Sequence, residues 1–193
     1  MTEAQGAWAA VVLSGGRARR LGGAPKHEVL VGGRTLLDRT LEAVAAASEV
    51  IVVGEGNAGP GALVIREEPA FAGPAAAIGA ALRHVRSPQV AVVACDHPFV
   101  AEAIDALMAE KWDGADGVIA VDSTGRRQNL LFTASRTVLQ SAIARRTSLI
   151  DVAAHELLAD LDLREVTVSA RSLLDVDTWD DHAKLEEMDA GPD

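Results

Sequence analysis

Short apolar runs alternate along the first half of the chain with longer segments in which apolar residues recur every three or four positions. Apolar runs bounded by turn residues are typical of buried strands, and the longer period is typical of amphipathic helices. The predicted elements are strands at 8–13, 49–54, 62–67 and 89–95, and helices at 35–47, 75–85 and 101–112. This alternation predicts an α/β fold. The unbroken apolar run at 89–95 favours a central parallel strand covered on both faces.

The second half of the chain departs from strict alternation. A hairpin is predicted from two apolar runs that are joined through a short turn containing Gly125. The further predicted elements are strands at 116–122, 129–134, 164–169 and 173–177, and helices at 137–146, 148–161 and 178–188. Ser148 and Thr178 stand where helix caps are expected. Because no repeat, linker or composition shift interrupts the pattern, we predict one domain over 1–193 with at most a small lobe and a frayed C-terminal tail.

Composition narrows the classes of function. The 193 residues are 49% hydrophobic with a mean hydropathy of +0.15, enough for one good core. Eighteen basic and 28 acidic residues give a net charge of −10, which argues against a nucleic-acid partner. We expect a cytoplasmic protein that does not bind membranes, because no apolar run is long enough to span one and no signal peptide is recognisable. The single Cys95 excludes an internal disulfide and a cysteine-based zinc cage.

The segment LSGGRARRLGGAPK, residues 13–26, follows the first predicted strand and carries the strongest chemical signal. It combines glycines at 15, 16, 22 and 23 with three arginines and Lys26. In open α/β sheets, ligands bind beyond the carboxyl ends of strands, and glycines let backbone amides approach phosphate oxygens. The spacing matches neither the P-loop nor the dinucleotide fingerprint. The segment therefore predicts an anion-binding loop, with a basic surface loop as the alternative.

This segment resembles the LxGGxxxRxGxxK signature of nucleotidyltransferases, and its GGRARRLGG stretch is most similar to molybdenum cofactor guanylyltransferases. Further motifs of that family follow in order along the chain. They are VGGRTLLDRTL at 31–41, REEPAFAGPAAAIGAAL at 66–82, VVACDHPFV at 92–100 and LLDVDTWDDHAKL at 173–185. The resemblance implies a Rossmann-like three-layer αβα nucleotidyltransferase fold with a mostly parallel mixed sheet, whose N-terminal part binds the nucleotide and whose C-terminal part binds the acceptor.

The same resemblance implies a Mg²⁺-dependent enzyme that transfers GMP from GTP to the terminal phosphate of molybdopterin and releases pyrophosphate. A phosphate monoester is largely dianionic near neutrality, so the protein's task is positioning and charge neutralisation. Two alternatives stay open: cytidylyl or other nucleotidyl transfer to molybdopterin or another phosphorylated metabolite, and a non-catalytic nucleotide-binding module. The expected partners are small molecules, and we expect a monomer or a weak homo-oligomer.

The resemblance also assigns site residues. The predicted catalytic residues are Arg20, Lys26 and Asp96, and the predicted metal ligands are Asp96 and Asp177, with Asp175 left open. The predicted nucleotide-binding residues are Leu13, Ser14, Gly15, Gly16, Arg20, Gly22, Lys26 and Gly73. From its position directly after an apolar strand, Asp96 suits Mg²⁺, although a helix cap would also explain it.

Other positions are less decided. Asp116 and residues 126–129 suit either an acceptor contact or a surface hairpin. The chain departs from the family pattern at Pro25, Ala77 and Trp179. A methyl group at position 77, where glycine is common, could crowd the nucleoside and leaves the base undecided.

Overall fold

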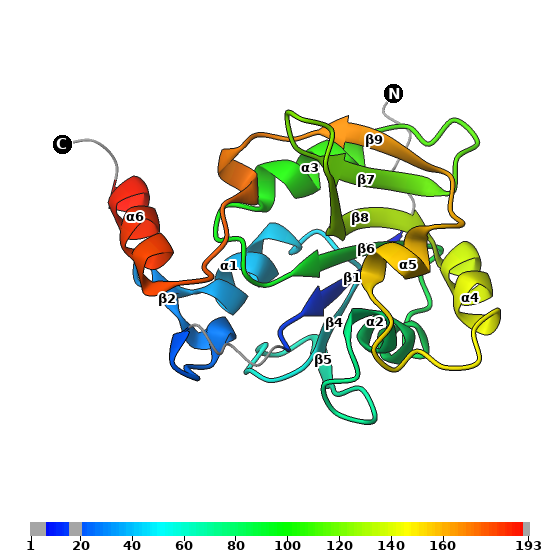
Figure 1. Ribbon diagram of the computed structural model, residues 1–193, viewed down its shortest axis with the longest axis horizontal. Coiled ribbons are helices and arrows are strands. Elements are labelled where there is room, and N and C mark those ends of the chain that lie inside the picture. Colours follow the sequence, from blue (N-terminus) through cyan, green and yellow to red (C-terminus); the bar gives the residue numbers. More distant parts are fainter. Residues whose placement is uncertain (1–6, 16–20, 191–193) are drawn as a thin grey trace.

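The computed structural model describes residues 7–15 and 21–190. Gly16 and Arg20, two of the predicted site residues, lie outside these ranges, as do Arg17 and Arg19. We follow the labels of Figure 1 for the elements of the described part.

A seven-stranded sheet forms the centre of the fold, in the order β5-β4-β1-β6-β8-β7-β9 (Figure 1). Its strands are β1 (Trp8–Leu13), β4 (Glu49–Val53), β5 (Ala62–Ile65), β6 (Gln89–Ala94), β7 (Gly117–Val121), β8 (Arg127–Ser135) and β9 (Leu163–Thr167). All neighbours pair in parallel except β8, which runs antiparallel to both β6 and β7. The predicted mostly parallel mixed sheet is confirmed, as is the β7–β8 hairpin.

Helices cover both faces of this sheet because β1 and β6 are apolar on both sides. Alternate residues of β1 point to opposite faces, so Val11 joins one buried cluster and Val12 joins the other. The helices of the first face are α2 (Pro74–Leu82), α4 (Arg136–Ala144) and α5 (Ala154–Leu158). The second face carries α1 (Leu36–Ala43) and α3 (Ala101–Ala109). This is the predicted three-layer αβα fold.

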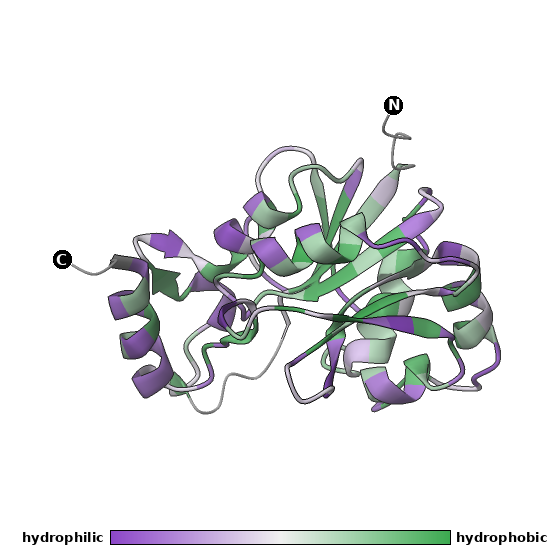
Figure 2. Cartoon of the chain, turned by 90° about the horizontal axis from the view of Figure 1, so that it is seen from above, coloured by the Kyte–Doolittle hydropathy of each residue, from purple (hydrophilic) through white to green (hydrophobic). Residues whose placement is uncertain are grey.

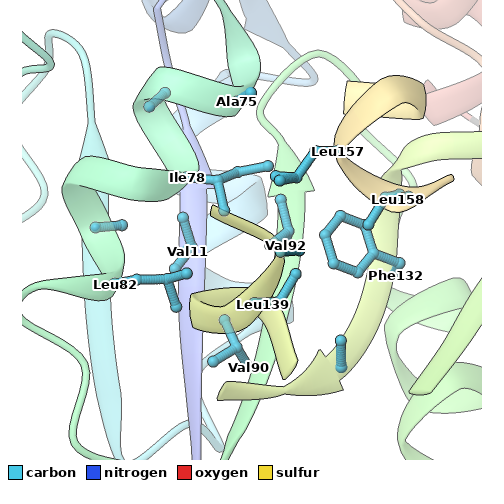
Figure 3. Packing of buried hydrophobic residues seen from close by; sticks show 14 of the residues in the cluster. Val11, Ala75, Ile78, Leu82, Val90, Val92, Phe132, Leu139, Leu157 and Leu158 are labelled. Carbon is cyan, nitrogen blue, oxygen red and sulfur yellow. The ribbon is translucent and has the colours of Figure 1, made fainter. Parts of the chain in front are cut away.

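The first face has the larger core. Figure 3 shows Val11 and Val92 of the sheet packed against Ile78 of α2, with Phe132 of β8 beside Leu158 of α5. Figure 2 shows the hydrophobic strands enclosed by helices whose outer sides are hydrophilic. No helix in residues 7–15 and 21–190 is both long and apolar enough to cross a membrane.

A small lobe, which we define as η2 (Lys26–Glu28), β2 (Leu30–Val31), β3 (Arg34–Thr35) and α6 (Trp179–Ala190), lies at one end of the sheet (Figure 1). Its separate apolar cluster contains Leu21, Val29, Val31, Leu36, Val176 and Leu185. Polar contacts also fasten α6 to the hairpin: His182 Nε2 lies 2.7 Å from the Leu30 carbonyl, and Glu186 Oε1 accepts from the Gly32 amide at 3.2 Å. The sequence pattern did not predict this two-stranded hairpin.

Two predicted elements are wrong. The helix predicted at 148–161 is restricted to Ala154–Leu158, because Asp151 adopts a left-handed φ of 58° and its amide donates to the Ala72 carbonyl. The Ser148 hydroxyl accepts from the Ile150 amide and so stabilises a turn instead of a helix start. The predicted strand at 173–177 is not part of any sheet among the described residues, and a 3-10 turn, η3 (Arg171–Leu173), precedes it.

The predicted start of the last helix is confirmed. The Thr178 hydroxyl oxygen accepts from the Asp181 amide at 3.2 Å, and the Asp181 carboxylate accepts from the Thr178 amide at 3.0 Å. This reciprocal pair satisfies two backbone donors at the N-terminus of α6.

Candidate functional site

An open cavity of about 350 Å³ lies at the carboxyl ends of β1, β4 and β6. The three strands are in register there, since Leu13 pairs with both Val53 and Ala94. The lining residues are Leu13, Ser14, Gly15, Lys26, Val53, Glu67, Phe71, Gly73, Pro74, Ala77, Ala94, Cys95, Asp96 and Leu130. The structure therefore brings six of the predicted site residues together: Leu13, Ser14, Gly15, Lys26, Gly73 and Asp96. Gly22 is exposed in a turn with a φ of 68° and does not line the cavity.

Backbone contacts fix the start of the glycine-rich segment on one side of the cavity. The Ser14 amide donates to the Val53 carbonyl at 2.9 Å, and the Ser14 hydroxyl donates to the Glu55 carbonyl at 2.7 Å. Gly54 has a φ of 130°, and a Cβ added there would lie 2.5 Å from the Gly15 nitrogen. The chain leaving β4 and the chain leaving β1 thus pass each other at a distance that only glycine allows.

The opposite wall carries two residues that the sequence reasoning missed, Glu67 and Phe71. Glu67 is 8% exposed, and its Oε1 accepts from the Phe71 amide at 2.9 Å. Glu67 follows β5 by two residues, just as Asp96 follows β6 by two, so its position at a strand end was a usable signal. Gly73, with a φ of 98°, begins α2, and Ala77 of the same helix also lines the cavity.

Charged side chains gather at the mouth of the cavity. The Lys26 ammonium lies 2.7 Å from Asp177 Oδ1 and 3.1 Å from Asp96 Oδ2, and Asp175 is the third carboxylate of the group. Burial disfavours the charged form of Lys26, but the two carboxylates outweigh it and raise the pKa of Lys26 above its usual value. Burial likewise opposes ionisation of Asp96, yet His97 and Lys26 lower the pKa of Asp96 below its usual value. The ion pairs therefore hold both groups in their charged forms.

The backbone explains how residues so distant in sequence meet. Asp96 leaves the end of β6, where the Cys95 amide donates to the Leu13 carbonyl at 3.0 Å. The Val176 amide in turn donates to the Asp96 carbonyl at 3.1 Å, which brings the segment 173–177 alongside without forming a strand. The two predicted metal ligands thus lie together, although the strand predicted to carry Asp177 is absent.

The donor set fits a hard divalent cation. Asp96, Asp175 and Asp177 each offer a carboxylate oxygen, and these oxygens lie within 4.8 Å of one another. Asp96 Oδ1 is buried, lies 3.4 Å from His97 Nε2 and accepts no hydrogen bond from the described residues, so it has lone pairs to offer. Burial, together with the neighbouring Asp177 and Asp96, raises the pKa of Asp175. Oxygen ligands of this kind are the ones that Mg²⁺ takes in proteins.

Two further positions have structural explanations. Burial raises the pKa of the Cys95 thiol to about 12, so the thiol is protonated and unreactive at neutral pH. Asp116 lies just before β7, at the end of that strand away from its carboxyl end, and its side chain accepts from the Asp162 amide at 2.9 Å. This contact gives Asp116 a structural role at the start of β7, and no contact with an acceptor is needed to explain it. Residues 126–129 belong to the β7–β8 hairpin and do not line the cavity.

Comparisons with known proteins agree with this arrangement. Residues 10–172 match the family model of the MobA-like NTP transferase domain. A molybdenum cofactor guanylyltransferase of Shewanella sp. (strain ANA-3) is 31% identical over 125 residues, which are 62% of this chain and 64% of that enzyme. A probable molybdenum cofactor guanylyltransferase of Pelotomaculum thermopropionicum is 32% identical over 151 residues, 73% of this chain and 72% of that protein.

A solved structure extends the likeness over nearly the whole chain. Molybdopterin-guanine dinucleotide biosynthesis protein A of Archaeoglobus fulgidus has a TM-score of 0.73 to this chain at 25% identity, covering 95% of this chain and all of that one. The sequence alignment with the Shewanella enzyme, by contrast, takes in less than two thirds of that enzyme's length.

Proposed function

The chain belongs to the MobA-like NTP transferase domain family, and we propose that it transfers GMP from GTP to the terminal phosphate of molybdopterin with release of pyrophosphate. The observation that carries this proposal is the charged group at the mouth of the cavity, where Lys26 and three carboxylates meet beyond the ends of β1 and β6. The proposal takes guanine as the base and molybdopterin as the acceptor from the names of the relatives. The family and the position of the cavity at the strand ends support the proposal that a nucleotide binds there.

The chemistry needs little from the protein beyond position and charge. The acceptor phosphate is already an anionic nucleophile near neutrality, because its second pKa is about 6. Lys26 would donate to phosphate oxygens of the triphosphate and neutralise charge on the departing pyrophosphate. Gly15, which lines the cavity, would offer its backbone amide to the same phosphates, and Gly16 and Arg20 are proposed to add a second amide and a second cation.

We include Mg²⁺ in the proposal, held by Asp96 and Asp177 with Asp175 beside them. When bound there, the ion would neutralise triphosphate oxygens and hold them in one orientation. The observation in its favour is the buried Asp96 Oδ1, which accepts no hydrogen bond from the described residues.

Glu67 gives the proposal a base preference. It is buried in the cavity wall, and among the described residues the Phe71 amide donates to its Oε1. Guanine presents two adjacent N–H donors on its Watson–Crick edge, whereas cytosine presents one amino group there. A buried carboxylate acceptor therefore favours GTP over CTP.

The test is nucleotidyl transfer by the purified chain, with pyrophosphate release measured for GTP and for CTP in the presence of molybdopterin. We expect GTP to be used, Asp96→Asn to abolish turnover, and Glu67→Gln to lower kcat/KM for GTP by about 10- to 100-fold, the loss of one charge-assisted hydrogen bond. Asp105→Asn, at an exposed position on α3, is the matched control and should leave the rate unchanged.

Other outcomes of the same assay would change the assignment. Preferential use of CTP would make the chain a cytidylyltransferase, and nucleotide binding without turnover on any acceptor would make it a binding module. The cytoplasmic location, the monomeric or weakly oligomeric state and the absence of nucleic-acid partners remain predictions from the sequence.

A further inference from the structure

The carboxylates assigned to the metal already hold a cation that belongs to the chain. The Lys26 ammonium donates to Asp177 Oδ1 at 2.7 Å and to Asp96 Oδ2 at 3.1 Å, and its side chain is only 19% exposed. A lysine ammonium has three N–H donors and no acceptor. With two of them directed at carboxylates, Lys26 offsets part of the negative charge of the group when neither metal nor nucleotide is bound.

The position of Lys26 gives it a second set of partners. Lys26 lines the cavity as well as contacting the carboxylates, and it begins the three-residue turn η2 on the small lobe. Its long side chain can turn toward a triphosphate without movement of β6, which Asp96 follows. The same ammonium is thus within reach of two anions, the carboxylate group and the phosphates.

We propose that Lys26 and the divalent cation are alternative occupants of the Asp96, Asp175 and Asp177 carboxylates, and that an incoming triphosphate makes room for the cation by drawing Lys26 away. This rests on the proposed function for the identity of the anion and of the metal. In the nucleotide-free protein, Lys26 lowers the affinity for metal. Nucleotide and metal then bind with positive coupling, which is reciprocal, and the coupling passes through a single side chain.

Charge explains the direction of the effect. The three carboxylates lie within 4.8 Å of one another, and like charges at such a distance oppose ionisation unless a cation sits among them. One ammonium offsets part of this negative charge, and a divalent ion would offset more of it. Removing the ammonium takes one positive charge away from these carboxylates, while His97 Nε2 stays 3.4 Å from Asp96 Oδ1, so metal should bind more tightly, not less.

The experiment measures Mn²⁺ binding to the full chain in the absence of nucleotide and acceptor, by the electron paramagnetic resonance signal of free Mn²⁺. Lys26→Met removes the ammonium and keeps the bulk of the side chain, and we expect it to bind Mn²⁺ at least about tenfold more tightly than the unaltered chain. Lys111→Met, at an exposed position after α3, is the matched control and should leave the affinity unchanged.

Two further variants keep the outcome interpretable. Lys26→Gln retains hydrogen-bond donors without the charge, and it serves as a second test should Lys26→Met fold poorly. We expect it to bind Mn²⁺ more tightly than the unaltered chain, but by a smaller factor than Lys26→Met. Asp175→Asn placed in the Lys26→Met chain should lower the gain at least severalfold, which locates the metal at this group. Equal or weaker binding by both Lys26 variants would overturn the proposal, as would a gain that survives loss of Asp175 and Asp177 together.

The result is independent of the proposed reaction, because no nucleotide is present. Tighter Mn²⁺ binding in a chain that proves unable to transfer GMP would refute the proposed function alone. Unchanged Mn²⁺ binding in an active guanylyltransferase would refute only the exchange of Lys26 for metal.

Discussion

The close approach between Gly54 and the start of segment 13–26 makes Gly54→Ala an informative substitution. The added Cβ would lie 2.5 Å from the Gly15 nitrogen and 2.7 Å from the Ser14 hydroxyl oxygen, at a φ of 130°. Backbone strain of this kind costs about 1–3 kcal/mol, and overpacking against backbone costs about 1–3 kcal/mol more. At about 2–4 °C per kcal/mol for a chain of this size, the melting temperature should fall by about 10 °C.

Gly61→Ala is the matched control, because Gly61 also has a positive φ, 99°, but has no atom within 4 Å of its added Cβ. It should show the strain without the clash, so its melting temperature should fall by less. GTP binding, followed by the rise in melting temperature with GTP, should weaken at least about tenfold in Gly54→Ala and stay unchanged in Gly61→Ala. Equal melting temperatures, or full GTP affinity in Gly54→Ala, would show that the contact with Ser14 and Gly15 does not shape the site.

Two other predictions concern stability. Phe132→Ala removes a fully buried ring from the larger core and should lower the free energy of unfolding by about 3–5 kcal/mol, measured by urea denaturation; a loss below about 1 kcal/mol would mean that the ring is not packed as described. The Glu49 carboxylate accepts hydrogen bonds from the Arg86 and Ser87 amides and from the Ser87 hydroxyl. Although burial alone would raise it, these donors hold the pKa of Glu49 below its usual 4.5, so the carboxylate stabilises the fold at neutral pH and loses this effect as the pH falls below that value. Glu49→Gln should therefore lower stability at pH 7, and the difference in stability between the two proteins should shrink as the pH falls below 4.5; a difference that does not change with pH would contradict this role.

The elements with the strongest apolar pattern were predictable from the sequence. The run at 89–95 is buried on both faces as β6, and the run at 8–13 is β1. The helix predicted at 148–161 failed because hydrogen bonds from other segments decide that region: the Ala75 amide donates to the Val152 carbonyl, next to Asp151. A local apolar period cannot report such contacts. The β2–β3 hairpin was missed because each strand has two residues, too few to show any period.

The identities of the charged site residues were predictable, but their contacts were not. Lys26 and Asp177 are 151 positions apart, and only the folded chain shows that their side chains meet. Ser14 and Gly73 reached the cavity as predicted, because strand ends and the residue before α2 converge there. The position of Glu67 two residues after β5 was the one usable signal for it, because its burial shows only in the folded chain.

The residues of the charged group are synthesised at different times, because they come from distant parts of the chain. β1, Gly15, β4 and Asp96 are synthesised early, and the strand ends that line the cavity lie together once β6 pairs with β1. Asp175, Asp177 and the buried Leu185 of α6 come from the last stretch to be made. A nascent chain therefore carries one of the three carboxylates, and Lys26 gains its second acidic partner only when the segment 173–177 lies beside Asp96. A chain that ends before residue 173 would contain the seven strands of the described sheet but lack the charge on which we expect transfer to depend.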